Sequence, residues 1–240
     1  TWASGNFDEI AQLIWTVGPN LVDRVGVGAG QDVLDIAAGT GNAAIPAAAT
    51  GPAVTASDLT PELFVVGRAN AEAAWTTVSY AQALRQVRAA ASWILAQGLS
   101  AERPLAILSD NSIDHALLAL AAQHVGVPSA AISPAYSLMS KDFDKLKSMI
   151  ALLEPGAIYV SATKSFAAAL AAIKPLHKAQ IISGNADDGD ALAFRTVVAT
   201  PESPDVAKAF AAVTPDTIAK FLFTSGSTGT PKAVINTQRM

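Results

Sequence analysis

The sequence contains no cysteine. This absence excludes disulfide bonds, thiolate catalysis and thiolate metal sites. No apolar run approaches the roughly 18 residues that a membrane-spanning helix needs; one of the longest covers Phe166 to Ile173. No signal peptide is recognisable either. We therefore expect a cytoplasmic protein with no membrane span.

Charged side chains are also scarce, at 15% of the chain, and the net charge is −4. Lys and Arg form no cluster that would give a cationic face, so nucleic acid is not an expected partner. The three histidines, His115, His124 and His177, show no metal-ligand spacing, and we expect no metal site. Apolar residues make up 51% of the chain, which is enough to form a buried core.

The charge is unevenly distributed along the chain. Residues 1–65 carry a net charge of −6, whereas residues 66–240 carry +2. Such an asymmetry indicates two units of different character. We therefore predict two domains, 1–65 and 66–240, although no Gly/Ser-rich or Pro-rich linker marks the join.

The first unit is predicted to contain two strands separated by a glycine-containing loop and a helix. An apolar strand over 33–36 leads into the loop, the helix is expected over 43–49, and a strand over 53–57 ends at Asp58. Glycine lets the backbone approach a ligand closely, and an acid at the tip of the second strand can accept hydrogen bonds from ribose hydroxyls. The loop is not G-x-G-x-x-G, so a dinucleotide site is the weaker interpretation.

Residues 35–42, followed by Asp58, resemble the cofactor motif of class I S-adenosylmethionine-dependent methyltransferases. The resemblance covers about residues 6–64 and implies a partial Rossmann-like methyltransferase unit. S-adenosylmethionine would be held by Asp35, Ala37, Gly39, Gly41 and Asp58. The later strands of that fold and its acceptor site do not follow, so methyl transfer is not expected. A tight turn that binds no ligand is the alternative.

The second unit alternates helices with strands. Helical spacing of apolar residues and helix-capping residues predict four helices, and short apolar runs predict strands between them. The helices are expected over 79–97, 110–125, 141–153 and 165–173, and the strands over 105–108, 129–132, 157–160 and 179–182. This alternation indicates an α/β domain with a largely parallel sheet.

A strand over 221–223 leads into a loop from Thr224 to Lys232, and a second extended run follows. Pro231 precedes the lysine and no Ser or Thr follows it, so this is not the G-x-x-x-x-G-K-[ST] loop. Glycines let backbone N–H groups converge, hydroxyls add donors and the lysine adds positive charge, a set that suits a polyphosphate. The residues assigned to this site are Thr224, Ser225, Gly226, Ser227, Thr228, Gly229, Thr230 and Lys232. A plain solvated loop is the alternative.

The ordered string Thr-Ser-Gly-Ser-Thr-Gly-Thr-Pro-Lys is identified as the signature of the adenylate-forming superfamily, the AMP-dependent synthetases and ligases. Residues 77–80, 125–128 and 132–136 also resemble that family, so the resemblance covers about 70–240. It implies the incomplete N-terminal α/β domain of an acyl-CoA synthetase. Residues 231–238 are most similar to the feruloyl-CoA synthetase group, which activates aromatic acids. By this resemblance, the β- and γ-phosphates of ATP would be contacted by Ser225, Ser227, Thr228 and Lys232.

The same resemblance implies ATP, Mg²⁺ and CoA as cofactors and a small-molecule carboxylic acid as substrate, converted first to acyl-AMP and then to a thioester. The family's later adenine and ribose motifs and its catalytic lysine lie downstream of the loop, and the chain ends eight residues after Lys232. We therefore expect a truncated ligase with no complete catalytic set, inactive alone. Two alternatives stay open: an S-adenosylmethionine-binding, methyltransferase-like fragment, and a chimera created by sequence assembly with no activity.

Overall fold

The computed structural model describes residues 17–26, 28–29, 32–36, 53–57, 65–67, 76–78, 80–185, 189–224 and 231–240. The chain divides into two compact units. One comprises residues 1–66 and 72–78, and the other comprises residues 67–71 and 79–240. Within the described ranges, no helix is long and apolar enough to cross a membrane.

The first unit contains one described helix and a pair of parallel strands. The elements up to residue 78 are α2 (Val17–Val25), β1 (Asp32–Ile36), β2 (Ala53–Ser57), β3 (Val65–Gly67) and β4 (Thr76–Val78). β1 and β2 pair in parallel, whereas β3 and β4 form a separate two-stranded sheet. Parallel neighbours need a crossover between them, which agrees with the two strands predicted from the sequence. The helix predicted over 43–49 lies outside the described residues.

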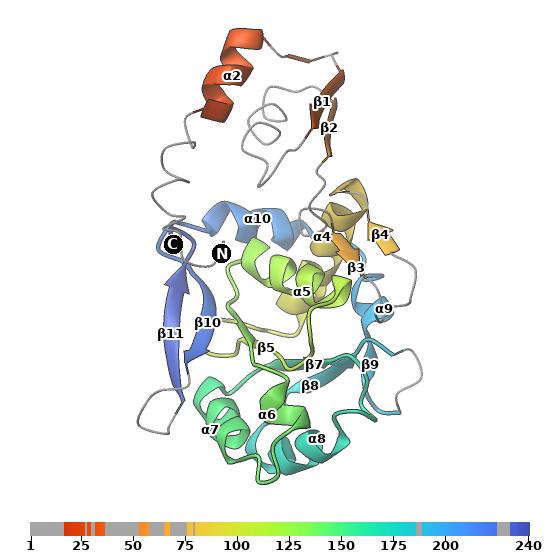
Figure 1. The fold of residues 1–240 in the computed structure, drawn as a ribbon, viewed down its shortest axis with the longest axis vertical. Helices are drawn as coiled ribbons and strands as arrows, with labels where there is room; N and C mark the ends of the chain where they lie inside the picture. The colour runs from red at the N-terminus through yellow and green to blue at the C-terminus, as the bar shows by residue number, and fades with distance from the viewer. Residues whose placement is uncertain are drawn as a thin grey trace, which may run out of the picture. The chain divides into compact units, whose positions relative to one another are not determined.

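A seven-stranded sheet forms the centre of the second unit (Figure 1). In spatial order its strands are β11 (Lys232–Thr237), β10 (Ile218–Thr224), β6 (Ser129–Ala131), β5 (Leu105–Ile107), β7 (Ala157–Val160), β8 (Gln180–Ser183) and β9 (Leu192–Ala193). All neighbouring strands are parallel except β10 and β11, which are antiparallel. The chain passes from β5 to one neighbour, β6, and then crosses to the other, β7. A parallel sheet with such a reversal places its ligand sites outside the carboxyl ends of the strands.

Helices cover both faces of this sheet (Figure 1). One face carries α4 (Tyr80–Ala96), α5 (Ile113–His124), α9 (Phe194–Val197) and α10 (Pro204–Ala212); the other carries α6 (Ala135–Leu138), α7 (Asp144–Leu153), α8 (Ala167–Ile173) and the short 3₁₀ helix η3 (Lys174–Leu176). Because both faces are covered, the central strands are buried on both sides. This explains why they are continuous apolar runs rather than alternating ones.

The core beneath α7 and α8 shows how the sequence pattern produces this packing. Leu146, Met149, Ile150 and Leu153 recur at helical spacing and bury one side of α7. They meet the sheet residues whose side chains point to that face, Ala106, Leu108, Ala130, Ile132, Ile158 and Val160. The first three of the α7 residues are fully buried, so α7 shields the part of the sheet that it covers from solvent.

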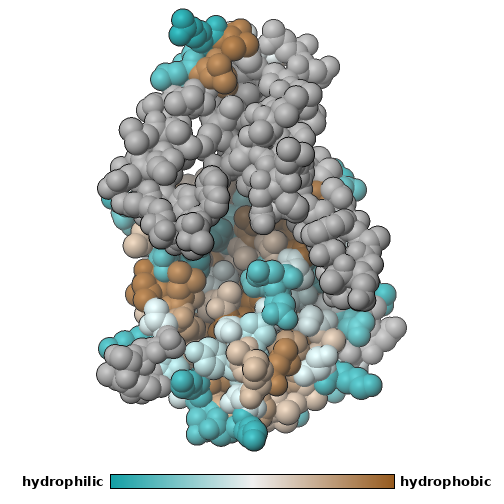
Figure 2. All heavy atoms as spheres, in the orientation of Figure 1, coloured by the Kyte–Doolittle hydropathy of each residue, from teal (hydrophilic) through white to brown (hydrophobic). Residues whose placement is uncertain are grey.

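β10 and β11 form a hairpin at one edge of the sheet. Thr224 pairs with Lys232, so the two strands enclose residues 225–231, of which 225–230 lie outside the described residues. The predicted loop thus joins two extended segments, as the sequence indicated. Figure 2 shows hydrophobic side chains over these strands, and the exposed ones include Leu222, Val234 and Ile235.

Candidate functional site

A crevice of about 450 Å³ opens at the carboxyl ends of β5, β6 and β10. The turn after β5 contributes Ser109, Asp110 and Asn111, and the turn after β6 contributes Ile132, Ser133 and Pro134. Its other lining residues include His115, Tyr136 and Phe223. Open parallel sheets bind their ligands at this edge, so the crevice is the candidate functional site.

Ser109 places an unpaired polar atom at this crevice. Its side chain is 3% exposed, and its Oγ has no hydrogen-bond partner among the described residues. Buried hydroxyls usually have a partner, because leaving one unpaired costs roughly 1–3 kcal/mol. A polar ligand atom in the crevice would satisfy this hydroxyl.

The start of α5 forms one wall of the crevice. Ser112 is the N-cap, and its Oγ accepts a hydrogen bond from the backbone N–H of His115 at 3.1 Å. Nδ1 of His115 lies 3.3 Å from the carbonyl oxygen of Asp110. Since a carbonyl can only accept, Nδ1 is the donor in this contact. The helix N-terminus beside the crevice favours negative charge on a ligand.

A hydrogen bond between buried Tyr159 and half-buried Asp114 links this helix to the sheet. The Tyr159 hydroxyl on β7 donates to Asp114 Oδ2 on α5 at 3.1 Å. Burial raises the pKa of the Asp114 carboxyl, and the hydrogen bond from Tyr159 opposes that change. Burial, together with the charge of Asp114, also raises the pKa of the Tyr159 hydroxyl, which therefore stays protonated at neutral pH. A Cβ on Gly184 would lie 2.8 Å from this hydroxyl, so the pair leaves no room for a side chain there.

The structure describes both ends of the predicted phosphate loop. Thr224 is exposed and directly follows Phe223, which lines the crevice. Lys232 is exposed at the start of β11, but it does not line the crevice; it borders a different pocket, of about 580 Å³, together with Glu102 and Glu154. The predicted residues Ser225, Gly226, Ser227, Thr228, Gly229 and Thr230 lie outside the described residues.

The predicted S-adenosylmethionine site is represented by one described residue. Asp35 lies in β1, in register with Ala56 of β2. The other predicted residues, Ala37, Gly39, Gly41 and Asp58, lie outside the described residues. This site therefore stays a prediction. In the described part of the chain, no group of three or more His, Cys, Asp or Glu side chains could hold a metal ion.

Sequence reasoning assigned no site residue to the turns after β5 and β6. Yet Ser109 to Asn111 and Ser133 to Tyr136 supply most of the crevice lining. A signal for them was present, because each polar stretch directly follows an apolar strand of a predicted parallel sheet. Carboxyl ends of such strands meet at one edge, so both turns could have been assigned to the same site.

Two solved structures have a fold similar to that of this chain. A natural red emitting luciferase from Phrixothrix hirtus aligns with a TM-score of 0.55 at 22% identity, covering 68% of this chain and 31% of the luciferase. ATP-bound MatB from Rhodopseudomonas palustris aligns with a TM-score of 0.53 at 21% identity, covering 72% of this chain and 32% of MatB. At these identities the similarity shows the fold alone.

An uncharacterized protein of Mycobacterium tuberculosis is 48% identical to this chain over 83 residues, which are 34% of this chain and 30% of that protein. The chain therefore spans about a third of the length of the proteins it matches. The family described as AMP-binding enzyme matches residues 59–240, a range that contains the seven-stranded sheet, the crevice and the hairpin. Because this match covers well over half of the sequence, the chain belongs to the AMP-binding enzyme family.

Proposed function

We propose that this chain is part of an enzyme that uses ATP to activate a carboxylic acid by adenylation. The main supporting observation is the position of the hairpin. β10 runs parallel to β6, so its carboxyl end, with Phe223 in the crevice and Thr224 at the loop, lies at the same edge as the carboxyl ends of β5 and β6. The loop from Thr224 to Lys232 thus starts beside the crevice. Membership of the AMP-binding enzyme family supports the use of ATP.

In the proposed reaction, a carboxylate oxygen attacks the α-phosphorus of ATP. A new oxygen–phosphorus bond gives acyl-AMP, and pyrophosphate leaves with the electron pair of the bond that breaks. The loop hydroxyls and Lys232 would hold the β- and γ-phosphates and stabilise the charge on the leaving pyrophosphate. Mg²⁺ commonly binds substrate phosphates with few protein ligands, which fits the absence of a carboxylate or histidine cluster among the described residues.

The finer identity of the substrates is also part of the proposal. The likeness of residues 231–238 to the feruloyl-CoA synthetase group supports an aromatic acid. By the same likeness, the thiol sulfur of CoA would attack the acyl carbon of acyl-AMP in a second step, forming the thioester while the acyl–oxygen bond breaks and AMP leaves. Both steps belong to the whole enzyme, and this chain spans 31–32% of the matched structures.

Binding of ATP to this chain can be measured by thermal unfolding. We expect Mg-ATP to raise the thermal unfolding midpoint of the chain; at about 100 times the dissociation constant it stabilises the folded state by roughly 2.7 kcal/mol. Lys232→Ala should weaken this binding about tenfold or more, because a hydrogen bond to a charged group contributes about 1.5–3 kcal/mol. Both quantities follow from unfolding midpoints recorded over a series of ATP concentrations.

Lys220→Ala is the matched control. Lys220 is also an exposed lysine of the hairpin, but it pairs with Asn236, away from the loop. This variant should keep the ATP response of the unmodified chain. An unmodified chain that does not respond to Mg-ATP, or an equal loss in both variants, would contradict the assignment of the loop to ATP.

A further inference from the structure

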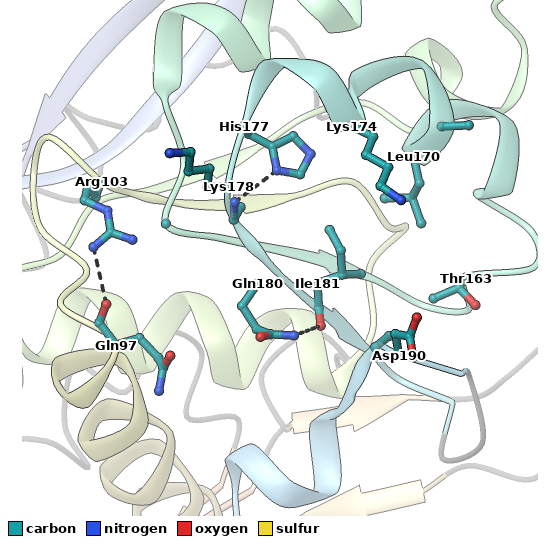
Figure 3. Close-up of a pocket in the computed structure, with 14 residues that line it drawn as sticks. Gln97, Arg103, Thr163, Leu170, Lys174, His177, Lys178, Gln180, Ile181 and Asp190 are labelled. Carbon is teal, nitrogen blue, oxygen red and sulfur yellow. Dashed lines mark hydrogen bonds between the residues drawn. The ribbon is translucent and has the colours of Figure 1, made fainter.

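A second cavity, of about 760 Å³, is lined by residues from α8, η3 and β8, none of which lines the crevice (Figure 3). Arg103 precedes β5, Gly156 precedes β7 and Gln180 begins β8, so these residues mark the amino ends of parallel strands. The crevice described above lies at the carboxyl ends. The two are therefore separate places on one sheet, and the adenylation reaction gives this cavity no role.

Positive charge predominates in the lining of the cavity. Arg103, Lys174 and Lys178 are cationic, and Asp190 is the single acidic residue that lines it. The ion pairs found among the described residues all involve other side chains. Cations gathered on a concave surface raise the local concentration of anions, so the cavity is suited to an anionic ligand.

Arg103 is held in place by the end of α4. Its Nη1 donates to the carbonyl oxygens of Gln97 at 3.4 Å and Gly98 at 3.3 Å. These contacts tie the guanidinium to the rim of the cavity (Figure 3). The cation therefore keeps a fixed position at the rim, where it adds to the positive potential of the cavity.

His177 adds a neutral donor. Its Nδ1 accepts a hydrogen bond from the backbone N–H of Ala179 at 3.1 Å, so the proton of the neutral ring is on Nε2. Burial lowers the pKa of His177 and keeps the ring neutral at pH 7. Nε2 is buried and has no partner among the described residues, an arrangement that native structures rarely tolerate without a ligand or water. Figure 3 shows this ring between the side chains of Lys174 and Lys178.

The cavity is larger than a single inorganic anion. Its volume falls within the roughly 300–1,000 Å³ of small-molecule sites. Leu170 of α8 and Ile181 of β8 form an apolar part of the lining beside the cations. Such a combination suits a ligand that carries both an anionic group and an organic body.

We propose that this cavity binds a phosphorylated small organic molecule. Lys174 and the Nε2–H of His177 contact the phosphate, Lys178 adds positive charge on the other side of the ring, and Leu170 and Ile181 pack against the organic part. Phosphate is the matching anion because lysine ammonium groups bind it as point charges and an N–H donor completes the contacts to its oxygens.

The probe is phenyl phosphate, with binding to the full chain measured by titration calorimetry. The double variant Lys174→Gln/Lys178→Gln removes two exposed charges of the cavity without touching the core. Lys164→Gln/Lys208→Gln is the matched control, because it removes two exposed lysines that do not line the cavity. We expect saturable 1:1 binding to the unmodified chain and the control, and about tenfold weaker binding to the cavity variant. His177→Gln should also weaken binding.

Comparing the binding of inorganic phosphate with that of phenyl phosphate measures the contribution of the organic part of the ligand. Inorganic phosphate should bind at the same site but more weakly, since it makes no contact with Leu170 and Ile181. Absence of phenyl phosphate binding by the unmodified chain, equal losses in both double variants, or loss of binding in Lys232→Ala would overturn the proposal. The response to Mg-ATP should be the same in the cavity variant and the unmodified chain, so failure here is distinguishable from failure of the adenylation proposal.

Discussion

The Ser109 hydroxyl is buried at the crevice with no partner among the described residues. Its removal should therefore affect the stability of the chain and the binding of a ligand in opposite directions. Ser109→Ala removes an unsatisfied polar group, so the free energy of unfolding of the unliganded chain should not fall and should rise by up to about 1 kcal/mol. The same change removes a hydrogen bond to a ligand in the crevice. The stabilisation by Mg-ATP should therefore decrease, as measured by urea unfolding with and without the nucleotide.

Ser137 supplies the control for this prediction. It is 4% exposed, and its Oγ also lacks a partner among the described residues, but it does not line the crevice. Ser137→Ala should give the same small gain in stability and leave the ATP response unchanged. If Ser109→Ala lowers stability, or if both variants bind ATP equally, the hydroxyl of Ser109 is not a ligand contact.

Some residues of the candidate site can be identified from the sequence alone, and others cannot. Lys232 could be selected because its proposed role rests on an ordered local string of residues. Ser109 could not be selected in the same way, because its burial depends on how β5 packs against neighbours that are distant in sequence. The contact between Asp114 and Tyr159 has the same origin, since 45 residues separate the two.

At the scale of elements, the predicted strands of the sheet agree closely with the structure. β7 is the clearest case, because it occupies the predicted residues 157–160. α7 begins at Asp144 rather than at residue 141, and the reason is local. Phe143 adopts a left-handed conformation with φ of 57°, and its N–H bonds to Ser140 Oγ, while Asp142 Oδ1 accepts from the N–H of Asp144. These side-chain contacts form a turn that competes with the helix.

The segment from 192 to 212 was not predicted, although the structure contains β9, α9 and α10 there. α10 is only nine residues long and buries only Val206, so few apolar positions mark it in the sequence. A start signal was nevertheless present. Ser203 is the N-cap, Pro204 occupies the first turn and Asp205 follows, an order typical of helix N-termini.

This cap gives a prediction for the element itself. Ser203 Oγ accepts from the N–H of Asp205 at 3.2 Å, and the N–H of Ser203 donates to Ser92 Oγ on α4 at 2.9 Å. Ser203→Ala should reduce the free energy of unfolding by about 1 kcal/mol, because the N-cap acceptor is lost. Ser203→Thr keeps the acceptor and should retain most of the stability. Urea unfolding measures both, and equal stabilities of the two variants would show that the cap contributes nothing.

At the scale of the whole molecule, the alternation of helices and strands predicts a parallel α/β sheet. The spatial order of the strands could not be predicted from the sequence. Both crossovers from β5 and β6 have ordinary lengths, and neither length says on which side of β5 the next strand pairs. That choice places β6 and β10 on one side and β7 on the other, and it gathers the crevice residues. Strand order depends on the packing of whole layers and not on local propensity.

The division into two compact units, each with its own internal contacts, leads to a prediction about the unfolding of the whole molecule. We expect thermal unfolding to show two transitions. Leu118 is fully buried in α5, so Leu118→Ala should destabilise the unit of residues 79–240 by about 3 kcal/mol and identify its transition. Mg-ATP should raise that transition alone. S-adenosylmethionine should raise the other if Asp35 and the loop after it form a site.

Asp35→Ala completes the experiment, because it should abolish a response to S-adenosylmethionine and leave the response to Mg-ATP intact. A first transition that S-adenosylmethionine does not move would reject the methyltransferase-like site while leaving the AMP-binding unit untouched. A single transition, lowered as a whole by Leu118→Ala, would instead show that the units unfold together. In that case a ligand of either unit would stabilise both, since binding to the folded state alone shifts the entire equilibrium.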